Sequence, residues 1–508
     1  MTNIHDSISN IKYLVSNIIL FFLLILGFYY RIYGLDNNYS FWTDENHVAI
    51  FVRAILERGQ PALTNGYSTG VYQWLQYWIS ALSACIFGLN EFAIRLPSVF
   101  FGVLTILVIY LLGKEIFNRR VGLLSTFFIT FMNIEILFSR QARPYQALQF
   151  FYLLGFYFIY RLTKEKIFNW RYFLGFLGCS VFASLMHGLG LTIFFSGFIY
   201  LLIFKASWFG KKWMFLGIFL LVLFGLIFKV QIFSILSSIG RTNNLFYYRV
   251  FMTHNYLPFC FLSFVGGLFL FWQKEYQKLT MFLLIFLIQA PIVSYFLFQP
   301  FTRYLYPIFG FIILLASYGM MDIGYLIFDI RKRVQGPASN IQYLVSGILI
   351  FVVVFSLWKS NKISFSPQKE YSLNADMQEI PEVDWKKVYG FVENTMKDNP
   401  KAVLITNWSD LPVWYLGEGK LDYILRKVDI ETIETFSGAK IVNNLESLNG
   451  IIKRYPKGIL VLDSWDDQVP EDIREFSHKN LKKELEVDRL YSVQPRYWPV
   501  SVYSWGIL

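Results

Sequence analysis

The sequence has little charge and very little cysteine. Only 16% of its 508 residues are Asp, Glu, Lys or Arg, whereas soluble domains usually contain about 25%. The three cysteines, Cys85, Cys179 and Cys260, are odd in number and stand in apolar surroundings at no metal-ligand spacing. We therefore expect them to pack in the interior, which excludes a disulfide framework, a redox pair and a zinc site.

Motifs for nucleotides are missing as well. The sequence contains no G-x-G-x-x-G, no P-loop and no D-x-D triplet, so a nucleotide or nucleotide-sugar site has no support. The net charge of +11 would suit nucleic acid. However, Lys and Arg cluster in short loops between apolar segments rather than on one face, which argues against a nucleic-acid partner.

Long apolar segments dominate the first two thirds of the chain. Hydrophobic residues make up 55% of the sequence, and they occur in blocks of about 17–25 residues, the length of a helix that crosses a bilayer. We predict about eleven spans. They are residues 13–34, 93–117, 121–139, 146–162, 171–187, 188–206, 213–235, 258–273, 279–298, 303–328 and 341–359. The first span lacks a cleavage site and is expected to stay as an anchor.

Basic residues occur in every second loop, which is the positive-inside pattern. This pattern predicts a cytoplasmic N-terminus. It places residues 35–92, 139–146, 236–257, 299–302 and those after about 360 outside the cytoplasm.

Segment 71–89 tests this topology, because it is apolar enough to span. If it crossed the membrane, all later basic loops would lie outside. It is also rich in Trp and Tyr, which favour the interface. We therefore expect an amphipathic helix on the outer membrane surface, and a true span stays the alternative.

The residues after 360 differ in composition. A polar, proline-containing linker precedes strand patterns at 402–406, 458–465 and 500–508 and helix patterns at 443–455 and 470–483. This alternation predicts a small α/β domain with a mainly parallel sheet. We thus predict two domains: 1–360, a membrane domain that includes the first outer loop 35–92, and 361–508, a soluble extracytoplasmic domain.

An acidic pair, Asp44 and Glu45 in FWTDENH, follows the first span on the predicted outer side. Acids beside a membrane span are costly and often functional. Two neighbouring carboxylates can supply a base, a metal ligand or both. The simpler alternative is that Thr43 caps a short helix and the two acids favour its first turn.

Other polar residues are predicted on the same side of the membrane. They are His47 and Arg53 in the first outer loop, Arg95 in AIRLPS, Arg143 and Tyr145 in SRQARPYQ, His187 in MHGLG, and Arg303, Tyr304 and Tyr306 in QPFTRYLYP. Arginine binds phosphate bidentately, and a carboxylate can deprotonate an attacking hydroxyl. The set fits group transfer from a phosphate-linked lipid, although interfacial snorkelling and packing remain simpler roles for single members.

The order of the Asp-Glu pair, RLPS, ARPY and RYLYP resembles the GT-C glycosyltransferases over residues 1–330, and more narrowly the protein O-mannosyltransferases and lipid A aminoarabinose transferases. The resemblance implies a polytopic GT-C fold, with Asp44 as the base or acceptor-orienting acid and Arg95 in donor binding. Some relatives carry an acid in the second outer loop. Here that stretch reads ARPY, with Arg143 and no acid.

The expected function is transfer of a sugar from a polyprenyl-phosphate donor to a hydroxyl of a glycan, lipid or protein on the outer side, with inversion. Asp44 and Glu45 would be catalytic. The arginines Arg95, Arg143 and Arg303 would bind donor phosphate, and His47, Arg53, Tyr145, His187, Tyr304 and Tyr306 would line the substrate cavity beside membrane lipid. No cofactor is certain, and a divalent metal held by Asp44, Glu45 and His47 stays open.

Two other classes remain as alternatives. The protein could be a translocator or scaffold for polyprenyl-linked glycans, or a glycan ligase or polymerase that uses a polyprenyl diphosphate. The translocator would be expected to have broken or polar helices at mid-membrane, and few charges occur inside the predicted spans.

Overall fold

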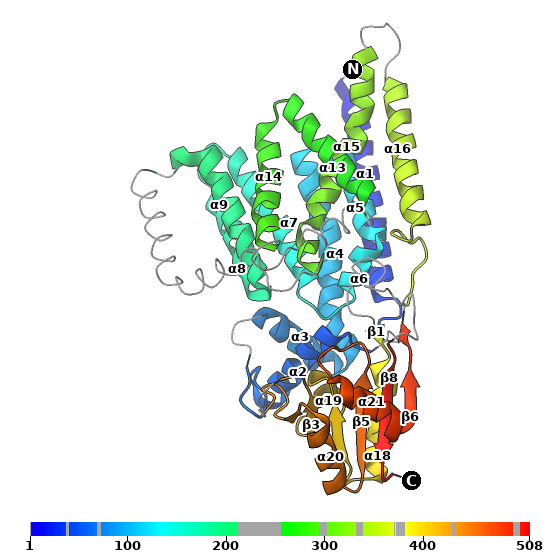
Figure 1. The fold of residues 1–508 in the computed structure, drawn as a ribbon. Helices are drawn as coiled ribbons and strands as arrows, with labels where there is room; N and C mark the ends of the chain where they lie inside the picture. Colours follow the sequence, from blue (N-terminus) through cyan, green and yellow to red (C-terminus); the bar gives the residue numbers. More distant parts are fainter. Residues whose placement is uncertain are drawn as a thin grey trace. The chain divides into compact units, whose positions relative to one another are not determined.

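The computed structural model describes residues 2–36, 40–68, 73–208, 210, 256–293, 302–331, 339–369, 371, 382–428, 433–490 and 498–507. The chain forms two compact units, coloured along the sequence in Figure 1. The helical unit comprises Met1–Tyr33, Ser98–Arg140 and Pro144–Tyr371, and the mixed unit comprises Gly34–Pro97, Gln141–Arg143 and Ser372–Leu508. The predicted span 213–235 and most of the predicted loop 236–257 lie outside the described residues.

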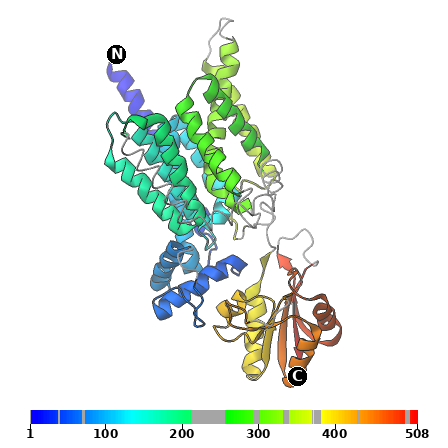
Figure 2. The same ribbon diagram turned by 60° about the vertical axis from the view of Figure 1, so that its left-hand side comes forward.

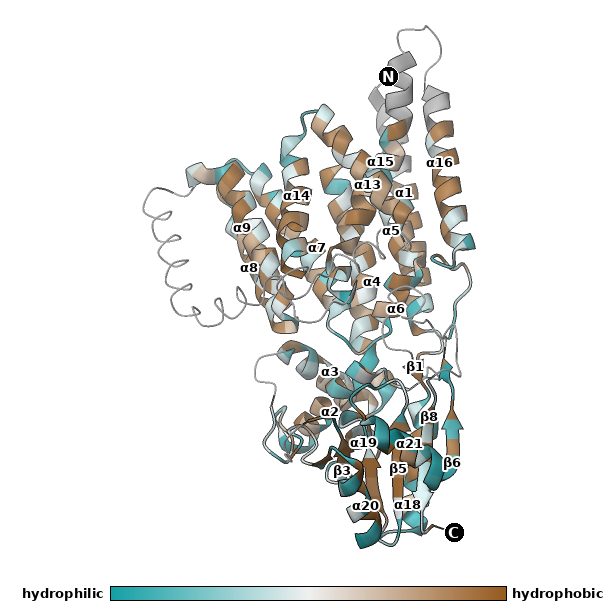
Figure 3. Ribbon diagram, viewed as in Figure 1, coloured by the Kyte–Doolittle hydropathy of each residue, from teal (hydrophilic) through white to brown (hydrophobic). Residues whose placement is uncertain are grey.

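Apolar helices build the helical unit, and their brown colour in Figure 3 reflects this composition. They are α1 (Thr2–Ile32), α4 (Glu91–Ile116, whose first turns belong to the mixed unit), α5 (Arg119–Phe131), α6 (Asn133–Ser139), α7 (Tyr145–Lys164), α8 (Trp170–Met186), α9 (Leu191–Lys205), α13 (Leu257–Trp272), α14 (Tyr276–Pro291), α15 (Tyr306–Arg331) and α16 (Ser339–Lys359), with 3₁₀ turns η1 (Gly188–Gly190), η2 (Ala206–Trp208) and η5 (Thr302–Tyr304).

Four of the described helical segments are long and apolar enough to cross a membrane, namely Tyr13–Ile32, Glu91–Ile116, Gly188–Trp208 and Tyr306–Ile323. Shorter apolar helices accompany them at Trp74–Phe87, Trp170–Met186, Leu257–Trp272 and Leu344–Lys359. The predicted class of polytopic α-helical membrane protein is therefore confirmed.

One predicted span is not a single helix. Segment 121–139 breaks at Met132, which has an extended backbone and bridges to Ile363. The backbone N–H of Asn133 donates to the carbonyl of Lys362 at 2.9 Å, and the Asn133 side chain donates to the carbonyl of Asn361 at 2.7 Å. The residues after α16 thus divide the segment into α5 and the short α6.

A six-stranded sheet forms the larger part of the mixed unit. It contains β2 (Val403–Thr406), β3 (Tyr423–Leu425), β4 (Lys440–Val442), β5 (Gly458–Asp463), β6 (Lys482–Val487) and β8 (Val500–Trp505), in the order β4-β3-β2-β5-β8-β6. The first four strands are parallel, and β8 is antiparallel to both β5 and β6. A separate antiparallel pair joins β1 (Glu382–Val383) to β7 (Arg489–Leu490).

Alternate residues of the strands enter two different cores. Leu404 and Ile459 pack with Val388 of α18 (Trp385–Asp398) on one face. Val403 and Leu460 pack on the other face, against the two helices α20 (Leu445–Arg454) and α21 (Glu471–Asn480). Figure 2 shows these helices on both sides of the sheet. The predicted α/β domain is thus confirmed as a three-layer sandwich.

The predicted boundary near residue 360 does not coincide with the division into units. Helices α2 (Thr43–Arg58) and α3 (Trp74–Phe87) of the first loop share a hydrophobic core with Trp414 and Phe436 of the C-terminal region. Residues 34–97 therefore belong with the α/β sheet rather than with the membrane helices.

Helix α3 has two apolar faces. Tyr77, Ala81 and Ala84 are buried in the core of the mixed unit, whereas Leu82 and Ile86 are 63% and 66% exposed. Its 14 residues extend only about 21 Å, short of the roughly 30 Å of a hydrocarbon core. These features favour the surface position that we predict for segment 71–89.

Candidate active site

Glu45 sits in the first turn of α2 with both carboxylate oxygens engaged. The oxygens accept hydrogen bonds from the backbone N–H groups of Trp42 (3.0 Å) and Ala142 (2.7 Å). They also accept from Nε and Nη2 of Arg95, at 2.9 and 2.8 Å. The side chains of Glu45 and Arg95 are 2% and 3% exposed. This pair joins the first loop, the second loop and the start of α4.

The bond to Trp42 is one half of a capping box, in which the Glu45 side chain accepts from the N-cap N–H. The Glu45 N–H donates in turn to the Trp42 carbonyl at 2.8 Å. The N-cap position is thus Trp42, one residue before the predicted Thr43. Both acids do lie in the first turn of the helix, where the helix dipole favours negative charge.

Asp44 is the accessible member of the acidic pair. Its side chain is 39% exposed and forms an ion pair with Nη2 of Arg143 at 2.5 Å. The Arg143 side chain is 4% exposed, and its guanidinium lies 4.5 Å from the centre of the Trp42 ring. The pair presents a fixed guanidinium beside a carboxylate that can be reached from solvent.

His47 lies one turn further along α2, between the rings of Phe51 (5.0 Å between centres) and Phe436 (5.3 Å). Burial lowers its pKa, as does the charge of Arg143, whereas Asp44 raises it. We therefore expect a neutral imidazole at pH 7. Within the described part of the chain, no three His, Cys, Asp or Glu side chains lie together as a metal site needs. The open alternative of a metal on Asp44, Glu45 and His47 does not fit, because Glu45 faces Arg95.

Arg53 packs against the C-terminal region rather than lining a cavity. Its Nη1 and Nη2 donate to the carbonyls of Val413 (3.1 Å) and Trp414 (2.9 Å) in α19 (Asp410–Tyr415). Its guanidinium also lies 4.6 Å from the centre of the Trp414 ring. Arg53 therefore stabilises the packing of α19 against α2.

One acid at this site was not predicted. Asp410 begins α19 just after β2, and the charge of Asp44 contributes to the pKa of its carboxyl. Burial, with a smaller contribution from the charge of Asp44, raises the pKa of Asp410 to about 7, although nearby backbone N–H groups and Arg426 lower it. The sequence did contain a signal, because polar residues at the carboxyl end of a parallel strand often bind ligands.

Three aromatic residues from separate loops meet in the helical unit. The ring of Tyr145 lies 5.6 Å from His187 and 6.1 Å from Tyr304, and the latter two are 5.9 Å apart. Arg303 is 6% exposed, with its guanidinium 5.6 Å from the Tyr304 ring. His187 also accepts a hydrogen bond at Nδ1 from the Leu189 N–H. These four predicted residues do form one cluster.

Tyr306 belongs instead to a closed polar network. It is fully buried, and its hydroxyl lies 2.8 Å from Oε2 of Glu135 and 2.6 Å from Oε1 of Gln146. Gln149 donates to Oε1 of Glu135 at 3.0 Å. A cavity-lining role for Tyr306, as predicted, has no support in this geometry.

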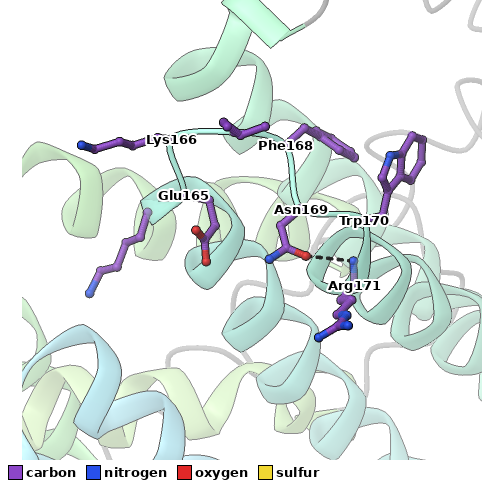
Figure 4. A pocket seen from close by; sticks show the side chains of 8 residues that line it. Glu165, Lys166, Phe168, Asn169, Trp170 and Arg171 are labelled. Carbon is purple, nitrogen blue, oxygen red and sulfur yellow. Dashed lines mark hydrogen bonds between the residues drawn. The ribbon is translucent and has the colours of Figure 1, made fainter.

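The predicted residues thus divide between the units. Asp44, Glu45, His47, Arg53, Arg95 and Arg143 lie in the mixed unit, and Tyr145, His187, Arg303, Tyr304 and Tyr306 lie in the helical unit. A cavity of about 710 Å³ at the α7–α8 turn, residues 164–171, contains none of them. It is lined by charged and aromatic side chains, and Asn169 accepts from the Arg171 N–H there (Figure 4).

Solved structures share this architecture. The structure of ArnT from Cupriavidus metallidurans in the apo state matches with a TM-score of 0.58 and 12% identity, over 98% of both chains. The archaeal oligosaccharyltransferase AglB from Archaeoglobus fulgidus matches with a TM-score of 0.55 and 11% identity, over 96% of this chain and 75% of AglB. The chain has the fold of the GT-C glycosyltransferases.

Sequence comparisons cover shorter stretches. The family model "Dolichyl-phosphate-mannose-protein mannosyltransferase" matches residues 74–229. An uncharacterised protein of Aquifex aeolicus is 30% identical over 156 residues, which is 29% of each chain. The match therefore spans less than a third of that curated relative. The GT-C fold and the apolar helices together establish a membrane protein.

Proposed function

We propose that this protein is a membrane glycosyltransferase that moves a sugar from a polyprenyl-phosphate donor to an acceptor hydroxyl. The GT-C fold and the mannosyltransferase family model support the class. A solved ArnT from Cupriavidus metallidurans, matched with a TM-score of 0.51 and 13% identity over 97% of this chain and 98% of that one, is bound to undecaprenyl phosphate. The AglB structure contains an inhibitory peptide and a dolichol-phosphate. These ligands support a lipid-phosphate donor here.

The ion pair of Asp44 and Arg143 carries the proposal. It combines an accessible carboxylate with a buried, oriented guanidinium, the two groups that a transfer from a phosphate-linked sugar requires. The rigid surroundings of Arg143 favour catalysis, because a preorganised charge need not reorganise when the reaction occurs.

The reaction is a displacement at the anomeric carbon. The acceptor oxygen forms a bond to that carbon while its proton passes to the carboxylate of Asp44. The bond from the anomeric carbon to the phosphate oxygen breaks, and the departing polyprenyl phosphate keeps the electron pair. Arg143 offsets the charge that grows on the phosphate. A single displacement inverts the anomeric configuration.

The other predicted residues take roles that follow from their contacts. Glu45 and Arg95 hold the first turn of α2 in place, and we assign them to positioning rather than to chemistry. Arg303 and the cluster of Tyr145, His187 and Tyr304 remain candidates for binding the donor. The positive-inside pattern supports a cytoplasmic N-terminus and a reaction on the opposite side of the membrane.

The proposal can be tested in membranes that are supplied with labelled sugar donors. The wild-type protein should transfer sugar from a polyprenyl monophosphate, and Asp44→Asn should lose most of that activity. Asp398→Asn, an exposed acid in the same unit, is the matched control and should stay active.

The same assay separates the alternatives. Transfer from a diphosphate donor and none from a monophosphate would favour a ligase or polymerase. Movement of lipid-linked glycan across the membrane without transfer would favour a translocator.

A further inference from the structure

The turn between α7 and α8 exposes large apolar side chains beside charged ones. Ile167 is 81% exposed and Trp170 is 64% exposed, although apolar surface is costly to leave in water. Both residues line the cavity of about 710 Å³ in the helical unit, and Figure 4 shows this turn from close by. Because the turn leads directly into the apolar helix α8, lipid is the neighbour that can cover these side chains.

Ring contacts hold the turn in one conformation. The Phe168 ring lies 4.8 Å from the Trp170 ring and 5.5 Å from that of Trp208 in η2. Lys205, at the end of α9, donates to the main-chain carbonyl of Glu165 at 2.8 Å. The cavity is thus formed by packed residues, so a ligand need not order the turn when it binds.

Positive charge exceeds negative charge around the cavity. Arg161 and Lys164 share a single acid, Glu115, at 3.0 and 3.2 Å. Lys166 and Arg171 are exposed, and within the described part of the chain their side chains form neither an ion pair nor a hydrogen bond. Figure 4 shows these two side chains at opposite ends of the turn. Phosphate is the counter-charge that Lys and Arg bind best.

Glu165 is the acid that opposes an anion at this cavity. Its carboxylate is half-buried in the lining and forms no ion pair with any described residue. Lys166 and Arg171 stand on the same turn, and Lys205 bonds to the main chain of Glu165 itself. The cations therefore outnumber this acid, and the local charge stays positive.

We propose that the α7–α8 turn binds the headgroup of an anionic phospholipid of the surrounding bilayer. Lys166 and Arg171 offset the charge of its phosphate, while Ile167 and Trp170 contact its apolar part. These two apolar side chains favour a lipid over a soluble phosphate. Loop charge predicts this turn on the cytoplasmic side, where the leaflet is anionic. The inference goes beyond the proposed transfer, because none of these residues belongs to the candidate active site.

Purified full-length protein tests the site by native mass spectrometry and by Tm in detergent with added ligand. Phosphatidylglycerol should be retained and should raise the Tm more than phosphatidylethanolamine or glycerol 3-phosphate does. The double variant Lys166→Gln/Arg171→Gln should bind phosphatidylglycerol about 25-fold more weakly, about fivefold for each charge removed. The control Lys114→Gln/Lys274→Gln removes two exposed charges from the same unit and should bind like the wild type.

Two single variants sharpen the test. Glu165→Gln should strengthen the binding of phosphatidylglycerol, because it removes the acid that opposes the phosphate. Ile167→Ser should weaken that binding but leave the binding of glycerol 3-phosphate unchanged, because only the lipid has an apolar part. Since both side chains are at least partly exposed, the Tm without lipid should stay at the wild-type value.

Three results would overturn the proposal. Equal losses in the two double variants would show that lipid is attracted only by the overall charge of the protein. Tighter binding of phosphatidylethanolamine would assign the cavity to a zwitterionic headgroup. Equal binding of glycerol 3-phosphate would make it a site for soluble anions. None of these measurements depends on sugar transfer, so the proposed function and this site succeed or fail separately.

Discussion

The helical and mixed units each contain a buried polar network, and the two networks differ in what they leave accessible. In the helical unit, Tyr306, Glu135 and Gln146 are fully buried and bond to one another. In the mixed unit, Glu45 and Arg95 are equally closed, but the neighbouring Asp44 is 39% exposed. Polar residues that satisfy one another hold the fold, whereas a charge that reaches solvent can meet a substrate.

The largest expected effect is on activity at Asp44. Asp44→Asn should lower the rate of transfer about 10²–10⁴-fold, because it removes the base. Its unfolding free energy should fall by about 1–3 kcal/mol, because the buried guanidinium of Arg143 loses its charged partner. Rate measurements and thermal unfolding on the same preparation check this. A loss of stability as large as that expected for Glu45→Gln would show that Asp44 is part of the closed network.

Glu45 should show the opposite profile. Glu45→Gln leaves the Arg95 guanidinium buried without its counter-charge, which should lower the free energy of unfolding by about 3–5 kcal/mol. Denaturant or thermal unfolding measures the loss. Glu57→Gln, which breaks an exposed pair with Arg58, is the control and should cost no more than about 1 kcal/mol. A stable but inactive Glu45→Gln would restore Glu45 to a catalytic role.

Tyr306→Phe tests the closed network of the helical unit. Removing the hydroxyl leaves Glu135 and Gln146 with one partner fewer in a buried site, at a cost of about 1–3 kcal/mol. Activity per folded molecule should be retained. Tyr276→Phe, at a half-exposed tyrosine, should be neutral. A selective loss of donor binding in Tyr306→Phe would instead place this residue in the substrate cavity.

The smallest effect is expected at Arg53. Arg53→Lys cannot donate to both carbonyls of α19 in the same fork geometry, so it should cost about 1 kcal/mol. Thermal unfolding measures the loss. An unchanged Tm would show that these two hydrogen bonds do not stabilise the packing of α19 against α2.

Composition and loop charge predicted the class of fold because the need to cross a bilayer constrains every residue of a span. The strand and helix patterns of 402–406, 443–455 and 458–465 were also confirmed. The break at Met132 was missed, because it depends on pairing with residue 363, far along the chain.

The roles of the site residues stay predictions, although the structure shows some of their contacts. The sequence analysis singled out Asp44 in the first predicted outer loop and Arg143 in the second. In the structure the two side chains form an ion pair. Sequence could not show that Glu45 turns toward Arg95, nor that Arg53 bonds to the end of α19. Both depend on how α2 packs against the α4 start and against α19, which no local pattern encodes.

Strand β8 lies between β5 and β6, although it follows both in the chain. Both β5 and β6 pair with β8, so these pairings cannot form before residues 500–505 have been synthesised. The hydrogen bond from Arg53 of α2 to α19 likewise cannot form before α19 has been synthesised. During synthesis α2 would therefore emerge long before α19, and such late, non-local assembly is slow. If the proposed transfer needs the whole mixed unit, a nascent chain that lacks β8 could not consume donor.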